Sequence, residues 1–85
     1  MHATPKRFVY LLRSTVTGKP YVGLTSDLPM RLAAHNAGQN RSTAKDKPWE
    51  LVVVLEFRTE SAAAGFERYL KSGSGRAFTK RRFLG

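Results

Sequence analysis

Several side chains in this 85-residue sequence have the types and spacing that phosphate chemistry uses. Arg31 and His35 are four residues apart, so on a helix they project from one face. An arginine there could donate hydrogen bonds to two phosphate oxygens at once, which a lysine cannot match. Tyr10 and Tyr21 lie in two β-prone stretches and could converge if their strands pair. Cleaving a phosphodiester requires an activated water and stabilisation of charge on the phosphate, and these residues could supply both.

The acidic residues limit any metal site, because the chain has only six of them. They are Asp27, Asp46, Glu50, Glu56, Glu60 and Glu67. The first five have structural explanations, such as an early helix position or a charge that blunts an apolar strand.

Glu67 is different, because it lies at the margin of an apolar helix stripe that contains Phe66 and Leu70. A carboxylate there needs a partner. Mg²⁺ tolerates a single protein carboxylate when waters and substrate phosphate complete its shell, so Glu67 could hold one such ion. A two-metal mechanism would need further carboxylates. The alternative is an ion pair with Lys71 one turn later, worth about 0.2–0.5 kcal/mol.

The charge balance indicates a polyanionic partner, most often nucleic acid. Lys and Arg number 15 and Asp and Glu 6, which gives a net charge of +9. Clustered in a loop and a tail, the basic residues suggest phosphate contacts. The nucleic-acid-binding candidates are Arg41, Lys45, Lys47, Lys71, Arg76, Lys80, Arg81 and Arg82.

Composition also excludes several classes of protein. The chain has no cysteine, which rules out a disulfide scaffold, a thiolate zinc site and a cysteine nucleophile. No apolar run approaches the roughly 18 residues of a membrane span, and the N-terminus has no signal-peptide pattern. We therefore expect a soluble, cytoplasmic protein with no membrane partner.

The strands that must position the tyrosines are marked by β-branched and aromatic residues. Strands are expected at residues 7–13, 21–24 and 50–57, the last being the most apolar. The first two should form an antiparallel hairpin. Trp49, just before the third strand, is expected to cover the core.

Helices with capping residues before them should follow the second and third strands. They are expected at residues 27–37 and 61–71, with a polar surface loop at 38–49 between the first helix and the third strand. Gly73-Ser74-Gly75 should end the second helix, and the basic tail could form a short further helix. The order predicts one α+β domain over residues 1–85, a small three-stranded antiparallel sheet flanked by helices.

Four sequence elements in order resemble the GIY-YIG nuclease superfamily. Phe8-Val9-Tyr10 and Tyr21-Val22-Gly23 are similar to the two tripeptides that name it. The segment from Thr25 to Asn36 resembles its helix with a catalytic Arg and often a His, and the segment around Glu67 resembles the one with its metal-binding Glu. The resemblance runs from about Phe8 to Phe83 and looks like that of small stand-alone bacterial members.

The resemblance implies a metal-dependent endonuclease or nickase acting on DNA or RNA, with DNA favoured. It implies these catalytic residues: Tyr10, Tyr21, Arg31, His35 and Glu67. Tyr10 would be the general base, assisted by His35 and Tyr21, and Glu67 would bind one Mg²⁺ or Mn²⁺. An unperturbed tyrosine is about one-thousandth phenolate at pH 7, a deficit of roughly 4 kcal/mol. A nearby arginine and metal would reduce that deficit, or His35 could take the proton through the phenol.

The sequence departs from the family pattern at two places. Phe8-Val9 replaces Gly-Ile, and no Asn follows Glu67 as it does in larger members. The 85 residues leave no room for the DNA-binding domain that larger members append, so we expect that any sequence specificity comes from a protein partner. Two alternatives remain: a non-catalytic nucleic-acid-binding module that retains this fold, and an RNA-associated module of unrelated fold, in which Tyr10 and Arg31 would lie far apart.

Overall fold

The sheet is three-stranded and antiparallel, in the order β2-β1-β3. The computed structural model describes residues 4–85. The strands are β1 (Phe8–Ser14), β2 (Pro20–Thr25) and β3 (Trp49–Glu56). The predicted hairpin is confirmed, because β1 pairs with β2 from Phe8 to Arg13. The central strand is β1, and most of it is buried, whereas the more apolar β3 lies at an edge and is mostly half-exposed or exposed.

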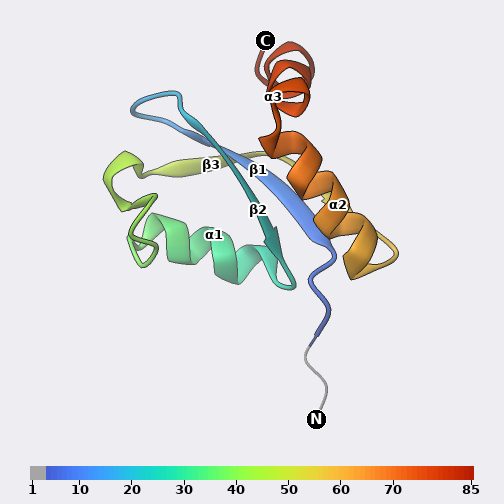
Figure 1. The fold of residues 1–85 in the computed structure, drawn as a ribbon. Helices are drawn as coiled ribbons and strands as arrows, with labels where there is room; N and C mark the ends of the chain where they lie inside the picture. Colours follow the sequence, from blue (N-terminus) through green and yellow to red (C-terminus); the bar gives the residue numbers. More distant parts are fainter. Residues whose placement is uncertain (1–3) are drawn as a thin grey trace.

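Helices follow the strands in the predicted order (Figure 1). They are α1 (Leu28–Asn36), α2 (Glu60–Lys71) and α3 (Gly73–Thr79), with a short 3₁₀ turn at Ala44–Asp46 and a π-helical turn at Lys80–Leu84. Asp27 caps α1 by accepting a hydrogen bond from the Met30 amide at 3.1 Å, and Thr59 caps α2 in the same way. The α+β class predicted from the sequence is therefore confirmed.

The glycine-rich segment after α2 starts a helix and does not merely end one. The predicted end of α2 at Lys71 is confirmed, but Gly73 begins α3, which Ser72 caps by accepting from the Gly75 amide at 3.2 Å. A Cβ atom on Gly75 would overlap the backbone of Tyr69 and Leu70. Glycine at this position therefore lets α3 pack tightly against the end of α2.

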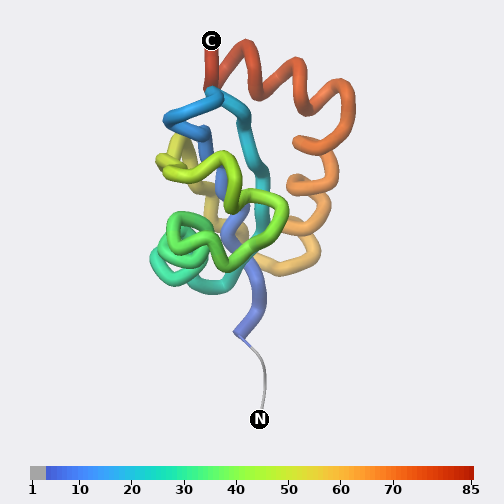
Figure 2. Tube along the Cα trace, turned by 90° about the vertical axis from the view of Figure 1, so that its left-hand side faces the viewer, coloured from blue at the N-terminus to red at the C-terminus, as the bar shows by residue number. Residues whose placement is uncertain are grey.

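The sheet separates two layers of helix (Figure 2). On one face Val9 packs with Ala63 and Leu70 of α2. On the other face Tyr10 and Leu12 form a cluster with Trp49, and the residues packed against this cluster include Leu32 of α1. Alternate residues of β1 therefore enter different cores, as the period of two in a strand requires.

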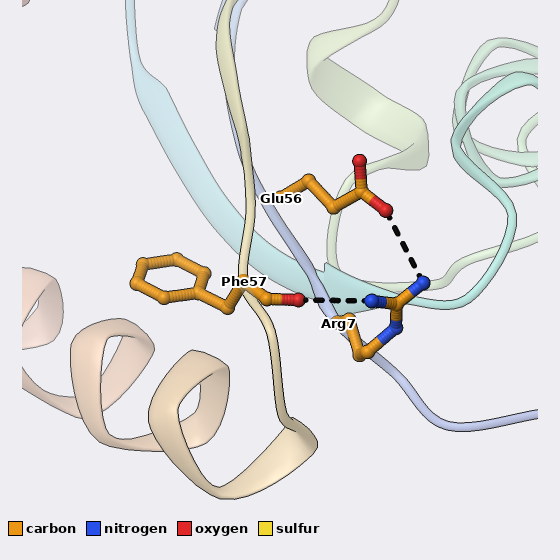
Figure 3. A network of polar contacts seen from close by, with 3 residues as sticks. All are labelled: Arg7, Glu56 and Phe57. Atoms are coloured by element: carbon orange, nitrogen blue, oxygen red, sulfur yellow. Dashed lines mark hydrogen bonds and ion pairs between the residues drawn. The ribbon is translucent and has the colours of Figure 1, made fainter.

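The connection from β3 to α2 is held against the start of β1 (Figure 3). Arg7 donates to the Phe57 carbonyl at 3.2 Å and forms an ion pair with Glu56 at 3.2 Å. The Phe57 amide in turn donates to the Arg7 carbonyl at 2.8 Å. These contacts set the position from which α2 begins.

The predicted surface loop at 38–49 is mostly exposed or half-exposed, but the prediction is wrong at Thr43 and Asp46, which are buried. Thr43 is 1% exposed and Asp46 is 8% exposed. Ser14 of β1 donates to the Asp46 carbonyl, and Trp49 Nε1 donates to the Thr43 carbonyl at 3.0 Å. Trp49, itself 5% exposed, covers the core as expected. Polar backbone groups that the loop buries are thus paired by side chains of the core, which hydropathy alone does not reveal.

Candidate active site

Tyr10 lies at the middle of the central strand, directly opposite Gly23 of β2. A Cβ atom at residue 23 would overlap the phenol carbon and hydroxyl of Tyr10, so only glycine leaves room for this ring. Tyr21 is two residues from Gly23 and pairs with Leu12, which places it on the same face of the sheet as Tyr10. The two phenol rings are 6.2 Å apart between centroids.

His35 is completely buried and joins α1 to the sheet. Its Nε2 atom is 2.9 Å from the Tyr10 hydroxyl, and its Nδ1 atom is 2.8 Å from the hydroxyl of Thr43. Both ring nitrogens therefore have partners, as a buried imidazole requires. The ring also meets Tyr21 edge-on, at a centroid distance of 4.8 Å. His35 thus contacts both tyrosines, and Arg31 lies one turn earlier on the same helix.

Burial dominates the electrostatics of this cluster. It raises the pKa of Tyr10, and Tyr21 and Glu67 raise it further, while the positive charge of Arg31 lowers it. Burial, together with Arg31, lowers the pKa of His35. Arg31 therefore acts on Tyr10 in the direction expected from the sequence, but desolvation outweighs it. At neutral pH Tyr10 is a phenol and His35 a neutral imidazole.

Glu67 lies on α2 and is electrostatically coupled to Tyr10, because its carboxylate is one of the charges that raise the Tyr10 pKa. Its Oε2 atom is 3.3 Å from Lys71 Nζ, so the ion pair left open by the sequence does form. Lys71 is 54% exposed and the pair is an i,i+4 contact, which is worth only about 0.2–0.5 kcal/mol. Within residues 4–85 no hydrogen bond or ion pair reaches Oε1.

A metal could bind only in the single-carboxylate manner. In the described part of the chain no three His, Cys, Asp or Glu side chains gather into a metal-binding group. The Lys71 ammonium pairs with Glu67 Oε2 at 3.3 Å, so a cation bound there would have to displace it. The single carboxylate of Glu67 fits one hard divalent cation only if waters and substrate phosphate complete its shell.

Three of the basic candidates line one groove of about 740 Å³, whose walls come from β2 on one side and the chain from α2 onward on the other. They are Lys71, Arg76 and Lys80, and Tyr21 of β2 lies in the opposite wall. Arg41 lines a separate hollow beside Arg31, whereas Arg81 and Arg82 line a third one with Tyr69. Lys45 and Lys47 belong to the 3₁₀ turn and its end. The eight basic candidates therefore do not form one surface.

Two residues of the cluster's surroundings were not predicted. Thr43 binds His35. The side-chain oxygen of Asn36 accepts from the Trp49 backbone amide at 2.6 Å, and its side-chain nitrogen donates to the Trp49 carbonyl at 3.1 Å. Asn36 thereby ties the end of α1 to the start of β3. The only sequence signal for these two contacts was the polarity of the 38–49 loop, and it favoured exposure.

No helix in the described residues is both long and apolar enough to cross a membrane.

Comparison with known proteins gives one family over nearly the whole chain. The family model described as the GIY-YIG catalytic domain matches residues 6–82. The structure-specific endonuclease subunit slx1 of Aspergillus oryzae is 42% identical over 82 residues, covering 89% of this chain and 20% of that protein. Its counterpart from Aspergillus terreus is 43% identical over 65 residues, covering 68% of this chain and 17% of that protein.

The same subunit from Cryptococcus neoformans is 40% identical over 65 residues, covering 68% of this chain and 13% of that protein. The chain thus spans a fifth or less of the length of these relatives. All three are fungal, so they give no support to a bacterial type. No solved structure matches the chain significantly.

Proposed function

The chain belongs to the GIY-YIG family, and from that membership we propose that it is a metal-dependent endonuclease or nickase that hydrolyses phosphodiester bonds in DNA. Membership also removes the alternative of an RNA-associated module of unrelated fold. The observation that carries the proposal is the buried chain of hydrogen bonds from Tyr10 through His35 to Thr43. Its two ionisable members, Tyr10 and His35, can pass a proton between them.

The donor and acceptor in each of these hydrogen bonds follow from the Thr43 hydroxyl, at the end of the chain. The Thr43 hydroxyl is 3.4 Å from the Asn40 carbonyl, which can only accept, so we assign this hydroxyl as the donor to it. The hydroxyl then accepts from Nδ1–H of His35. In that tautomer Nε2 carries a lone pair and accepts from the Tyr10 hydroxyl. Thr43 thereby keeps His35 ready to receive a proton from Tyr10.

A relay explains how a buried phenol could activate water. A free phenolate costs roughly 4 kcal/mol at pH 7 for an unperturbed tyrosine, and the raised pKa of Tyr10 makes this cost larger. In the relay, the attacking water gives its proton to the Tyr10 oxygen while the Tyr10 proton moves to Nε2 of His35. The water oxygen bonds to phosphorus, the P–O bond of the leaving strand breaks, and imidazolium remains. No free phenolate accumulates.

The other residues stabilise the negative phosphate. Arg31 would donate two hydrogen bonds to its nonbridging oxygens, and its charge is near enough to influence both Tyr10 and His35. Glu67 would hold a single Mg²⁺ or Mn²⁺ after Lys71 moves aside. When bound there, the ion neutralises phosphate charge and stabilises the leaving oxygen.

The relatives' names extend the proposal to substrate and partner. They are called subunits of structure-specific endonucleases, so we propose that this chain also acts on DNA of particular structure and does so beside a partner protein. The net charge of +9 supports a polyanionic substrate.

Cleavage of a supercoiled plasmid, single-stranded DNA and RNA, each with Mg²⁺ or EDTA, tests the proposal. The wild-type protein should cleave DNA only with the metal. Glu67→Gln should be at least about 100-fold slower, since it removes the carboxylate proposed to hold the metal. Glu60→Gln, on the same helix, is the matched control and should leave the rate unchanged. A wild-type protein that cleaves none of the substrates, or a Glu67→Gln variant that cleaves normally, would refute the proposal.

A non-catalytic nucleic-acid-binding module is the second candidate, and the Glu67–Lys71 ion pair favours it because the pair occupies the carboxylate. Such a module would bind DNA with strong salt dependence and would bind equally well after Glu67→Gln, with no strand scission under any condition.

A further inference from the structure

The groove beside Tyr21 has a composition that the cleavage chemistry does not explain. Its floor is apolar, with Val22, Leu70 and Leu84 among the lining residues. Arg76 and Lys80 lie along the same walls, and none of the lining residues is acidic. Its volume of about 740 Å³ is in the range of about 300–1,000 Å³ that small organic ligands use.

Apolar and basic residues in one groove suit an unpaired nucleotide better than a paired duplex. A paired duplex presents its phosphates and sugars outward and keeps its base faces stacked, so an apolar floor gives it nothing to contact. An unpaired nucleotide offers both a phosphate for the cations and an exposed base face for apolar or aromatic side chains. The basic lining, which has no acidic residue, favours the repeated phosphates of a nucleic acid over an anionic or neutral peptide.

We propose that this groove binds unpaired nucleotides of the DNA substrate next to the scissile bond. The inference rests on the proposed nuclease function and specifies its substrate as DNA that has a single-stranded portion. Arg76 and Lys80 bind the phosphates, and the floor with Leu84 receives the bases.

The position of the groove supports the same conclusion. Tyr21 belongs to its wall and also contacts His35 edge-on at 4.8 Å, so one residue joins the groove to the buried cluster. Lys71 belongs to the wall as well and forms the ion pair with Glu67. A strand that lies in the groove therefore lies beside Tyr21, one of the residues proposed to cleave it. Phosphates that draw Lys71 toward them would also release Glu67.

Binding measured in EDTA tests the groove without any cleavage. The probe is a fluorescein-labelled oligothymidylate of about ten nucleotides, compared with the same strand paired to oligoadenylate, by anisotropy across a salt series. The wild-type protein should bind the single strand more tightly. Arg76→Gln with Lys80→Gln should reduce the slope of log K against log salt by about 1.4, since each single-strand phosphate contact contributes about 0.7.

Two matched controls distinguish binding in the groove from the effects of overall charge and of any exposed apolar residue. Arg81→Gln with Arg82→Gln removes the same charge from the same segment but outside the groove, and should change the slope much less. Leu84→Asn should weaken single-strand binding about fivefold without changing the slope, because it removes an apolar contact only. Leu51→Asn, on the exposed face of β3, should leave binding unchanged. Circular dichroism verifies that each variant is folded.

The inference is overturned if the duplex binds as tightly as the single strand, if the Arg76/Lys80 and Arg81/Arg82 double variants have equal effects on the slope, or if Leu84→Asn binds like Leu51→Asn. These results leave the nuclease proposal intact, because they do not involve Glu67. Conversely, normal cleavage by Glu67→Gln would refute the nuclease proposal while the binding results stand.

Discussion

Replacing Thr43 by valine should separate the shape of this residue from its hydrogen bond. Valine has nearly the same shape as threonine, so the change removes the hydroxyl and leaves the packing in place. Thr43 is 1% exposed and His35 is fully buried, so no water can replace the lost partner of Nδ1 at 2.8 Å. A buried polar group left without a partner costs about 1–3 kcal/mol. The backbone carbonyl of residue 43 still accepts from Trp49, so the loop keeps its anchor.

This loss of stability is directly measurable. In a domain of this size, 1 kcal/mol corresponds to a Tm shift of about 4–8 °C. Thr43→Val should therefore lower Tm by at least about 4 °C and reduce the free energy of unfolding in urea. Thr43→Ser is the matched control, because it keeps the hydroxyl and loses one methyl group, which costs about 1 kcal/mol in a buried site.

The functional effect distinguishes a proton relay from mere packing. Without the Thr43 hydroxyl, His35 is free to carry its proton on Nε2 and donate to Tyr10, and then it cannot accept the phenol proton. Cleavage by Thr43→Val should fall by at least about tenfold below Tm, while Thr43→Ser keeps most of the activity. Nitrogen chemical shifts of His35 report the tautomer. If Thr43→Val keeps wild-type stability and tautomer, the hydrogen-bond assignment is wrong; if the tautomer changes but cleavage does not, the relay is wrong.

Further predictions concern the same cluster. Gly23→Ala should displace the Tyr10 ring, costing about 1–3 kcal/mol of stability by overpacking and reducing cleavage, as urea unfolding and plasmid assays will show. Because the folded-state pKa of His35 lies below the unfolded value of about 6.5, stability should be complete above pH 6.5 and decrease as pH falls below it; His35→Gln should remove that part of the pH slope in urea titrations. Because the folded-state pKa of Tyr10 is raised, stability should decrease above about pH 10, and less so in Tyr10→Phe. Asn36→Ala should cost about 1–3 kcal/mol by freeing both backbone groups of Trp49, and an unchanged Tm would contradict this.

Local patterns were sufficient to predict most of the fold. Strand alternation, capping residues and turn signals placed every strand and the first two helices within about two residues of their observed bounds, since these signals act between near neighbours in the chain. The order of the strands in the sheet was harder to predict from the sequence. The most apolar strand, β3, lies at an edge, because its apolar side chains are only partly covered, whereas β1 receives helices on both faces.

The candidate site likewise has some contacts that the sequence could predict and others that it could not. Arg31 and His35 could be placed on one helix face from their spacing, and the relation of Tyr10 to Tyr21 depends on the register of the hairpin, in which Gly23 faces Tyr10. The contact between His35 and Thr43 could not be found, because the loop that carries Thr43 reads as polar and its burial depends on partners elsewhere, such as Ser14 and Trp49.

The amino-acid sequence by itself determined which elements form and which side chains are available for chemistry, because propensity, capping and hydrophobic period depend on residues within a few positions of one another. Only the tertiary structure decided that Tyr10 is buried and bonded to His35, that Lys71 pairs with Glu67, and that a basic groove with an apolar floor reaches Tyr21. Desolvation and through-space charge depend on packing between distant segments, and they shift the pKa values of Tyr10 and His35.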